Sequence, residues 1–133
     1  MVATATDQVT PRRTGTAYPY PMRAATRVFE NTLVALTAAG FAQPAGLAGG
    51  VVIAGLSGHH SDNRTGADGA RRLRVEKAMS IQLPFDGAQP TAANIGANVF
   101  AVDDNTVSLD SLSGARLRVG TLDGFDGGPW IRI

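Results

Sequence analysis

The sequence has no cysteine, and lysine occurs once, at Lys77. The absence of cysteine excludes disulfide scaffolds, thiolate zinc sites and thiol nucleophiles from this chain of 133 residues. No apolar run approaches the roughly 18 residues of a membrane-spanning helix. The first residues carry no apolar segment of the kind found in secretory signals. We therefore expect no membrane partner and no secretory signal.

Excess charge of one sign is also small. The net charge of +1 is too low for a general nucleic-acid coat, so we expect no nucleic-acid partner. The basic residues are unevenly placed, because the first 27 residues hold Arg12, Arg13, Arg23 and Arg27 against one acid, Asp7. The basic character therefore lies at the front of the chain.

Large apolar residues are few. Aromatic residues make up 6% of the chain, and much of the 44% hydrophobic fraction is alanine. Alanine buries little area, so the core should be thin and should gain robustness from a partner. The length favours a single domain.

Residues 1–27 differ in composition from the rest. This segment contains Pro11, Pro19 and Pro21, and it has no helical period of apolar residues. Proline at this density favours an extended backbone. Tyr18 and Tyr20 each offer a large apolar face, a polar tip and few rotatable bonds. We predict an extended N-terminal arm over residues 1–27 that becomes ordered against a partner.

Residues 28–133 are typical of a series of short strands separated by glycine. Alternation at 70–77 indicates a half-buried strand, and the apolar run at 51–57 indicates a strand buried on both faces. One helical turn is predicted at 91–95. The fold class is therefore mainly β, a small β-barrel or sandwich with one short helical turn. The other predicted strands cover 31–39, 79–83, 99–102, 106–109, 115–122 and 129–133.

His59, His60 and Asp62 are the strongest candidates for a metal site, because two imidazoles and a carboxylate can bind a metal ion. Neighbours in sequence usually point apart, however, and this group lies in a loop rich in Gly, Asp and Asn. The pattern favours a solvated loop. We predict no metal and no cofactor, and keep a metal- or sugar-binding accessory module as an alternative.

The stretch from Asp62 to Gly69 is similar to a calcium loop. An EF-hand loop needs an oxygen ligand at its third position and glycine at its sixth, and here these are Arg64 and Ala67. We predict instead a hairpin loop held by Asx turns.

Catalytic patterns are missing. There is no GxSxG nucleophile elbow, and the phosphate-loop pattern is absent. The carboxylate pairs Asp103–Asp104 and Asp123/Asp126 lie in turns, where aspartate is favoured by backbone hydrogen bonding alone. We predict that the protein is not an enzyme.

Arginines also cluster further along the chain. Arg71, Arg72 and Arg74 share one predicted strand, and Arg116 and Arg118 could lie nearby. Such a stripe is either a solvated face or a contact face for an acidic partner, since the guanidinium matches carboxylates. Trp130, in the final predicted strand, is expected to anchor a core or an interface.

The order of several motifs resembles a known family. The segments are NTLVALTAAGFAQPA at 31–45, GLAGGVVIAGLS at 46–57, DNRTGADGARRLRVEKAM at 62–79, TAANIGANVFAVDDNTVS at 91–108 and RLRVGTLDGFDGGPWIRI at 116–133. In this order they resemble the capsid decoration, or cement, proteins of tailed bacteriophages. The long segment 1–27 departs from that pattern.

The resemblance implies a β-barrel decoration domain at 28–133, outside the major capsid lattice. It implies a virion protein made in the bacterial host cytoplasm, with the major capsid protein and further copies of itself as partners. The local threefold positions of capsids favour a trimer. Another virion component, such as a head-fibre base, a tail-tube protein or a head-completion protein, is the alternative. The predicted capsid-binding residues are Arg12, Arg13, Tyr18, Tyr20, Arg23 and Arg27.

Overall fold

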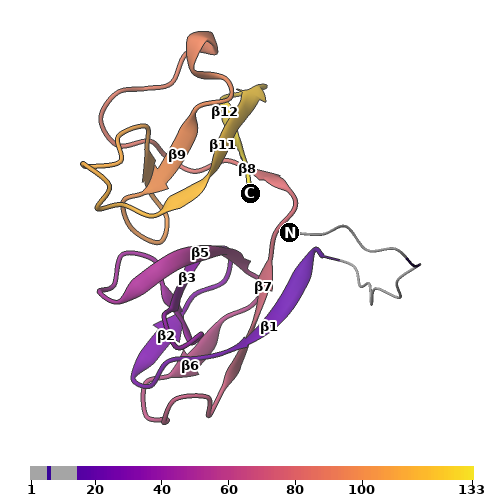
Figure 1. The fold of residues 1–133 in the computed structure, drawn as a ribbon, viewed down its shortest axis with the longest axis vertical. Coiled ribbons are helices and arrows are strands. Elements are labelled where there is room, and N and C mark those ends of the chain that lie inside the picture. Colours follow the sequence, from indigo (N-terminus) through magenta and orange to yellow (C-terminus); the bar gives the residue numbers. More distant parts are fainter. Residues whose placement is uncertain (1–5, 7–14) are drawn as a thin grey trace.

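The computed structural model describes Thr6 and residues 15–133. These residues form short strands and one 3-10 turn, η1 (Figure 1). In chain order the elements are β1 (Ala17–Pro21), β2 (Thr26–Val28), β3 (Leu33–Thr37), β4 (Ala42–Pro44), β5 (Gly50–Ser57), β6 (Ser61–Asn63), β7 (Arg72–Glu76), β8 (Ser80–Ile81), η1 (Ala92–Asn94), β9 (Asn98–Ala101), β10 (Val107–Ser108), β11 (Arg118–Phe125) and β12 (Pro129–Arg132).

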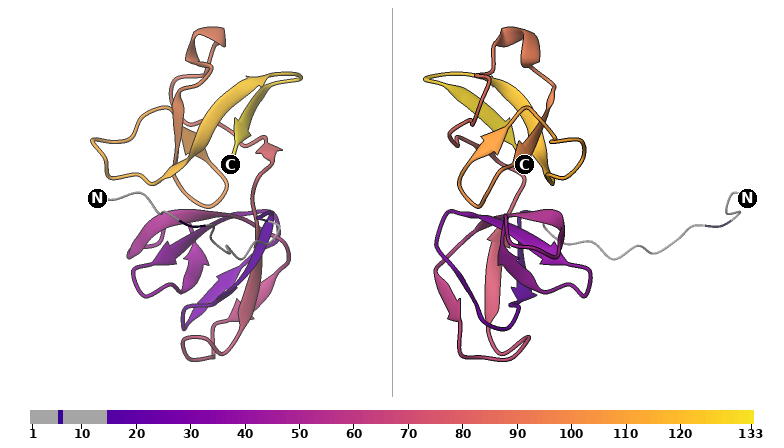
Figure 2. Two further views of the ribbon diagram at one scale, coloured as in Figure 1. Left: turned by 45° about the vertical axis from the view of Figure 1, so that its right-hand side comes forward. Right: turned by 90° about the vertical axis from the view of Figure 1, so that its left-hand side faces the viewer.

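The strands form two five-stranded sheets and a two-stranded ribbon. The first sheet has the order β1-β7-β5-β3-β4, the second has the order β10-β9-β11-β12-β8, and the ribbon joins β2 to β6. All strand pairs within them are antiparallel. Figure 2 shows the two sheets stacked, with the β7–β8 connection between them. The prediction of a mainly β fold is confirmed, but residues 15–133 form no closed barrel, because each of their two large sheets keeps two outer strands.

Two apolar clusters hold these layers together. One lies between the two sheets, and its buried members include Leu33, Ala35, Val99, Leu122 and Ile131. The other lies against the opposite side of the first sheet and contains Met22, Val28, Val34, Ala42, Leu73 and Val75. The hydrophobic effect is therefore divided over two thin layers rather than concentrated in one centre.

Local sequence patterns explain several strands directly. In β7, Leu73 and Val75 are buried while Arg72 and Arg74 are exposed, as the alternation predicts. The predicted turn between β9 and β10 forms where the Asn105 N–H donates to Asp103 Oδ1 at 2.9 Å. The predicted helical turn is η1, where the Thr91 N–H donates to Asn94 Oδ1 at 2.8 Å.

The prediction that residues 51–57 are buried on both faces is wrong. Val51 and Val52 have 56% and 49% of their surface exposed. β5 pairs with β3 from Gly50 to Leu56, but it pairs with β7 only at Leu56 and Ser57. Within the described part of the chain, its first half therefore has no paired strand on one side, which an apolar run alone does not reveal.

The first described strands do not follow the predicted boundary between an N-terminal arm at 1–27 and a β domain at 28–133. Ala17–Pro21 pairs with β7, and Thr26–Val28 pairs with β6. Met22, between them, is completely buried. These residues belong to the sheets, whereas residues 1–5 and 7–14 of the predicted arm lie outside the described part of the chain.

Candidate partner-binding surface

Prolines remove hydrogen-bond donors from the outward edge of β1. The Lys77 N–H donates to Thr16 O and the Met22 N–H donates to Arg71 O, each at 2.8 Å. Because peptide groups alternate along a strand, the even-numbered residues of β1 face β7, and Pro19 and Pro21 face outward. A missing N–H costs no ladder bond on that side. The same prolines leave this edge unable to donate to an added strand.

Tyr18 and Tyr20 lie half-buried on β1, with ring centroids 6.5 Å apart. The ammonium nitrogen of Lys77 lies 5.0 Å from the centroid of the Tyr18 ring, within cation–π range. Tyr20 packs against the Met22-containing core cluster and also lines an open cavity beside β5. Each ring is thus partly engaged within the fold and keeps an accessible portion.

Arg23 is engaged within the protein. Its Nη1 donates to Gln43 Oε1 at 2.6 Å and to the Ala48 carbonyl at 3.1 Å. The Gln43 amide donates in turn to the carbonyls of Leu47 and Ala48. Arg23 therefore fixes the turn that leads into β5.

Arg27 lies on the β2–β6 ribbon. Its guanidinium carbon is 4.5 Å from the centroid of the Phe29 ring, and that ring is 5.3 Å from the His60 ring. Phe29 is half-exposed. These side chains form a stacked group on the surface. Of the six predicted capsid-binding residues, Arg12 and Arg13 lie outside the described residues, and the other four do not meet in one pocket.

The carboxylate of Asp62 forms an ion pair with the guanidinium of Arg64. The Arg64 guanidinium donates to both carboxylate oxygens, at 2.7 Å in the shorter ion pair. These bonds hold the pKa of Asp62 well below its usual range. The Arg64 N–H also donates to Asp62 Oδ1, which forms the predicted Asx turn. His59 Nε2 instead accepts the Arg74 N–H at 3.1 Å. Throughout residues 15–133, no three His, Asp or Glu side chains gather as a metal site would need.

The loop after β6 clasps the segment that joins β1 to β2. Asn63 Nδ2 donates to the carbonyls of Arg23 and Ala67, each at 3.0 Å. Asp68 Oδ1 accepts the Ala24 N–H at 2.7 Å. The Asn63 side chain is buried, and its Oδ1 lies against Gly66 without a hydrogen bond. The loop therefore has a structural role in anchoring the chain after β1.

The arginine-rich strand is solvated. Arg72 and Arg74 are exposed on β7, and Arg74 Nη2 lies 3.3 Å from Glu76 Oε1. The more distant arginines are engaged in the second sheet: Arg116 donates to the Asp110 carbonyl, and Arg118 Nε donates to Asn98 Oδ1.

The prediction that Asp123 lies in a turn is wrong, because this residue belongs to strand β11. Asp123 Oδ2 accepts the Ser80 hydroxyl at 2.8 Å. The pKa of Asp104 is raised, first by burial and then by the neighbouring charge of Asp103. Trp130 is half-buried and its indole N–H donates to the Asp126 carbonyl at 2.8 Å.

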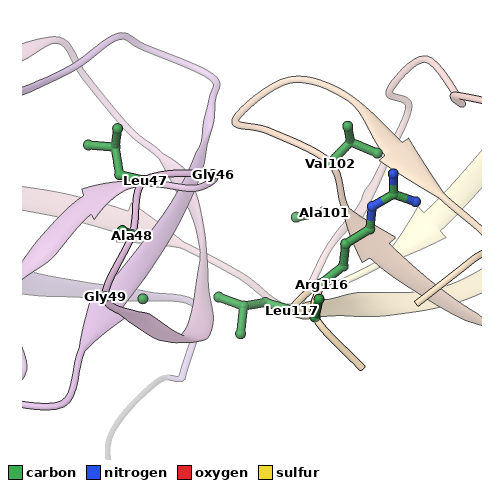
Figure 3. A pocket seen from close by; sticks show the side chains of 10 residues that line it. Gly46, Leu47, Ala48, Gly49, Ala101, Val102, Arg116 and Leu117 are labelled. Atoms are coloured by element: carbon green, nitrogen blue, oxygen red, sulfur yellow. The ribbon is translucent and has the colours of Figure 1, made fainter. Parts of the chain in front are cut away.

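The cavities are open to solvent. Figure 3 shows one of about 270 Å³ between the two sheets, with Leu47 on one side and Arg116 and Leu117 on the other. A second, of about 240 Å³, runs beside β5 and is lined by Tyr20, Leu36, Val52, Ile53, Ala54, Gly55, Lys77, Val119 and Ile133. Among the described residues, no helix is long and apolar enough to cross a membrane.

Exposed apolar side chains are the feature that sequence reasoning missed. Val51 and Val52 protrude from β5, and further large apolar side chains are exposed at Phe29, Leu47, Ile95, Leu112 and Phe125. No signal in the sequence marked this exposure, because the strands predicted at 51–57 and 70–77 are similar in length, whereas in the structure β5 has eight residues and β7 has five.

Comparison with known proteins gives no relative: no family model, no curated protein and no solved structure matches this chain.

Proposed function

We propose that this chain is a virion structural protein that binds the outer surface of the major capsid lattice and stabilises it, as a decoration or cement protein. The observation that carries the proposal is the exposed apolar surface of the described fold, above all Val51 and Val52. Val52 lines the open groove beside β5, and an exposed apolar surface of this kind favours a protein contact over solvent. The order of the motifs at 31–133 supports the same family of functions.

The attachment of β1 suits a protein that grips through its N-terminal segment. β1 forms five residue pairs with β7, and Met22 directly after it is buried. The loop that contains Asn63 and Asp68 holds the next residues by hydrogen bonds. These contacts would therefore resist a pulling force on the chain before Gly15, because β1 and the residues after it are bonded to the first sheet and to the loop.

Adhesion of this kind gains strength from copy number. Several copies, as a trimer or another closed oligomer, would bind neighbouring shell subunits at once, so that moderate contacts add up. The binding residues would be Arg12, Arg13, Tyr18 and Tyr20 with the accessible parts of Arg23 and Arg27. Arginine would meet carboxylates of the shell, and the tyrosine rings would fill surface pockets.

The test uses bare shells and the purified full-length chain. Bare particles, from the source that encodes this chain, are mixed with the protein, and bound protein is measured by co-sedimentation. The melting temperature of the shell is then measured with and without it. We expect saturable binding and a higher melting temperature, because a ligand that prefers the intact lattice stabilises it. Failure to bind, or equal melting, would overturn the proposal.

Copy number separates decoration from the alternative virion roles. A lattice-bound protein is present at on the order of hundreds of copies per particle, whereas a ring protein is present at about six to twelve. Quantitative mass spectrometry of purified particles measures this ratio.

A further inference from the structure

One strand of the first sheet has an open edge inside the sheet rather than at its outer border. β5 and β7 pair only at Leu56–Glu76 and Ser57–Val75. After Glu76 the chain turns away from the direction of β7. Ala78 has a positive φ of 62°, and its N–H donates to Ile133 O. Among the described residues, Gly50–Ala54 of β5 therefore has no paired strand on that side. Within the described chain, the main-chain groups of Val51 to Ala54 bond to no segment but β3.

This edge differs from the outer borders of both sheets. β1 carries outward-facing Pro19 and Pro21, and β4 has only three residues and ends in Pro44. In the second sheet the border strands β8 and β10 have two residues each. Proline and short length are the usual means by which proteins prevent strand addition. The Gly50–Ala54 edge has β-branched residues and no proline, so this protection is missing here.

Among the described residues, the groove beside the edge is lined mainly by apolar side chains and by the ammonium-bearing side chain of Lys77. Its apolar walls include Leu36, Val52 and Val119, and Lys77 stands at the Gly55 end. In the part of the chain that the structure describes, no Asp or Glu side chain lines the groove. Lys77 is exposed and, among the described residues, makes no ion pair, its charge resting against the Tyr18 ring. A partner with alternating apolar side chains and a carboxylate at this end would complement both features.

We infer that the Gly50–Ala54 edge of β5 accepts an extended acidic-ended segment of a partner protein as an added antiparallel strand. The strand occupies the line that β7 leaves at Glu76 and runs from the Lys77 end towards Gly50. Its first residue is acidic and faces Lys77, and its alternate apolar side chains enter the groove. The antiparallel direction follows from the sheet, in which all strand pairs are antiparallel. The inference rests on the proposed function for the source of the segment, a shell subunit.

The direct test uses a synthetic peptide, acetyl-Asp-Thr-Val-Thr-Val-Thr-amide, with the full chain. Hydrogen exchange of the amides at 50–54 is measured with and without it. At a peptide concentration about ten times Kd, strand addition slows exchange of the bonded amides about ten-fold. A peptide methylated at alternate backbone nitrogens keeps the side chains but loses the donors. Equal binding of the methylated peptide, or unchanged exchange at 50–54, would overturn the inference.

A charge exchange tests the predicted end of the strand. Lys77→Glu should weaken binding of the Asp-ended peptide about two- to five-fold, and a Lys-ended peptide should prefer this variant by a similar factor. Val52→Lys should abolish peptide binding, whereas Leu112→Lys, at an equally exposed apolar residue outside the groove, should not. No reversal with charge, or equal effects of the two lysine variants, would contradict the assignment.

The remaining outcomes separate this inference from the proposed function. If the free protein forms dimers that protect 50–54 without peptide, the edge belongs to a second copy and the inference is wrong. If the protein binds shells while 50–54 stay unprotected, the inference fails and the decoration role survives. If the peptide binds but shells do not, the proposed function fails instead.

Discussion

Nη1 of Arg23 donates a 2.6 Å hydrogen bond to Oε1 of Gln43, a side chain with no exposed surface. The two residues are 20 positions apart and join the segment after β1 to β4, the strand that lies between β3 and β5 in chain order. Arg23 was predicted from sequence as a capsid contact. Its position in the fold shows that it first holds the protein's own turn at residues 46–49.

Replacing Arg23 should destabilise the fold. Arg23→Ala leaves Gln43 Oε1 buried without its donor, which should cost about 1–3 kcal/mol of unfolding free energy. Urea denaturation measures the difference. Arg72→Ala is the matched control, because Arg72 is exposed and should change stability by less than about 0.5 kcal/mol. Equal stability of the two variants would show that the Arg23–Gln43 bond contributes nothing.

Gly66 should not tolerate a side chain. A Cβ at this position would overlap Oδ1 of the buried Asn63, whose amide nitrogen is fixed by the carbonyls of Arg23 and Ala67. Gly66→Ala should therefore cost about 1–3 kcal/mol by overpacking. Thermal unfolding provides the measurement. Gly124→Ala serves as the control, since nothing lies within 4 Å of a Cβ there. The clasp would be unimportant if both variants melted alike.

Asp104 should reduce stability at neutral pH. Burial and Asp103 raise the pKa of its carboxyl, so the folded state binds a proton more readily than the unfolded state. The folded protein therefore gains stability from this group as the pH falls through the raised pKa. Asp104→Asn should raise the melting temperature at pH 7, and the difference from wild type should shrink in acid, where Asp104 is protonated. Asp126→Asn is the control, and a difference independent of pH would exclude this cause.

The basic residues before β1 should contribute to shell binding. Arg12→Glu combined with Arg13→Glu should lower occupancy on particles and leave the melting temperature of the free protein unchanged. The loss should diminish at high salt, because exposed charge contacts are screened. Arg72→Glu with Arg74→Glu tests the exposed arginines of β7 in the same assay. If only this second pair lowers occupancy, the contact lies on β7 and not in the N-terminal segment.

Sequence patterns predicted the features that depend on neighbours along the chain. The alternation in β7, the Asp103 turn and the helical turn at 91–95 were found where expected, because each is set within a few residues. The prediction that β5 is buried on both faces was wrong, and of the predicted barrel or sandwich, the described residues form no closed barrel. Both features depend on which strands lie side by side. β5 extends beyond the end of β7 because the chain turns away at Ala78.

The candidate surface was predicted less well for the same reason. Arg23 meets Gln43, and Asn63 meets the carbonyl of Arg23 across 40 positions of sequence. No local pattern marks such contacts. An arginine that ends in an internal hydrogen bond has the same sequence signature as one that binds a partner.

The most direct test of the adhesive role is a cryo-EM map of native particles. The account predicts the two-sheet fold on the outer surface of the shell at on the order of hundreds of copies. Density in contact with shell subunits should include the groove beside β5. A lattice without this protein, or the fold confined to a single vertex or tail structure, would contradict it.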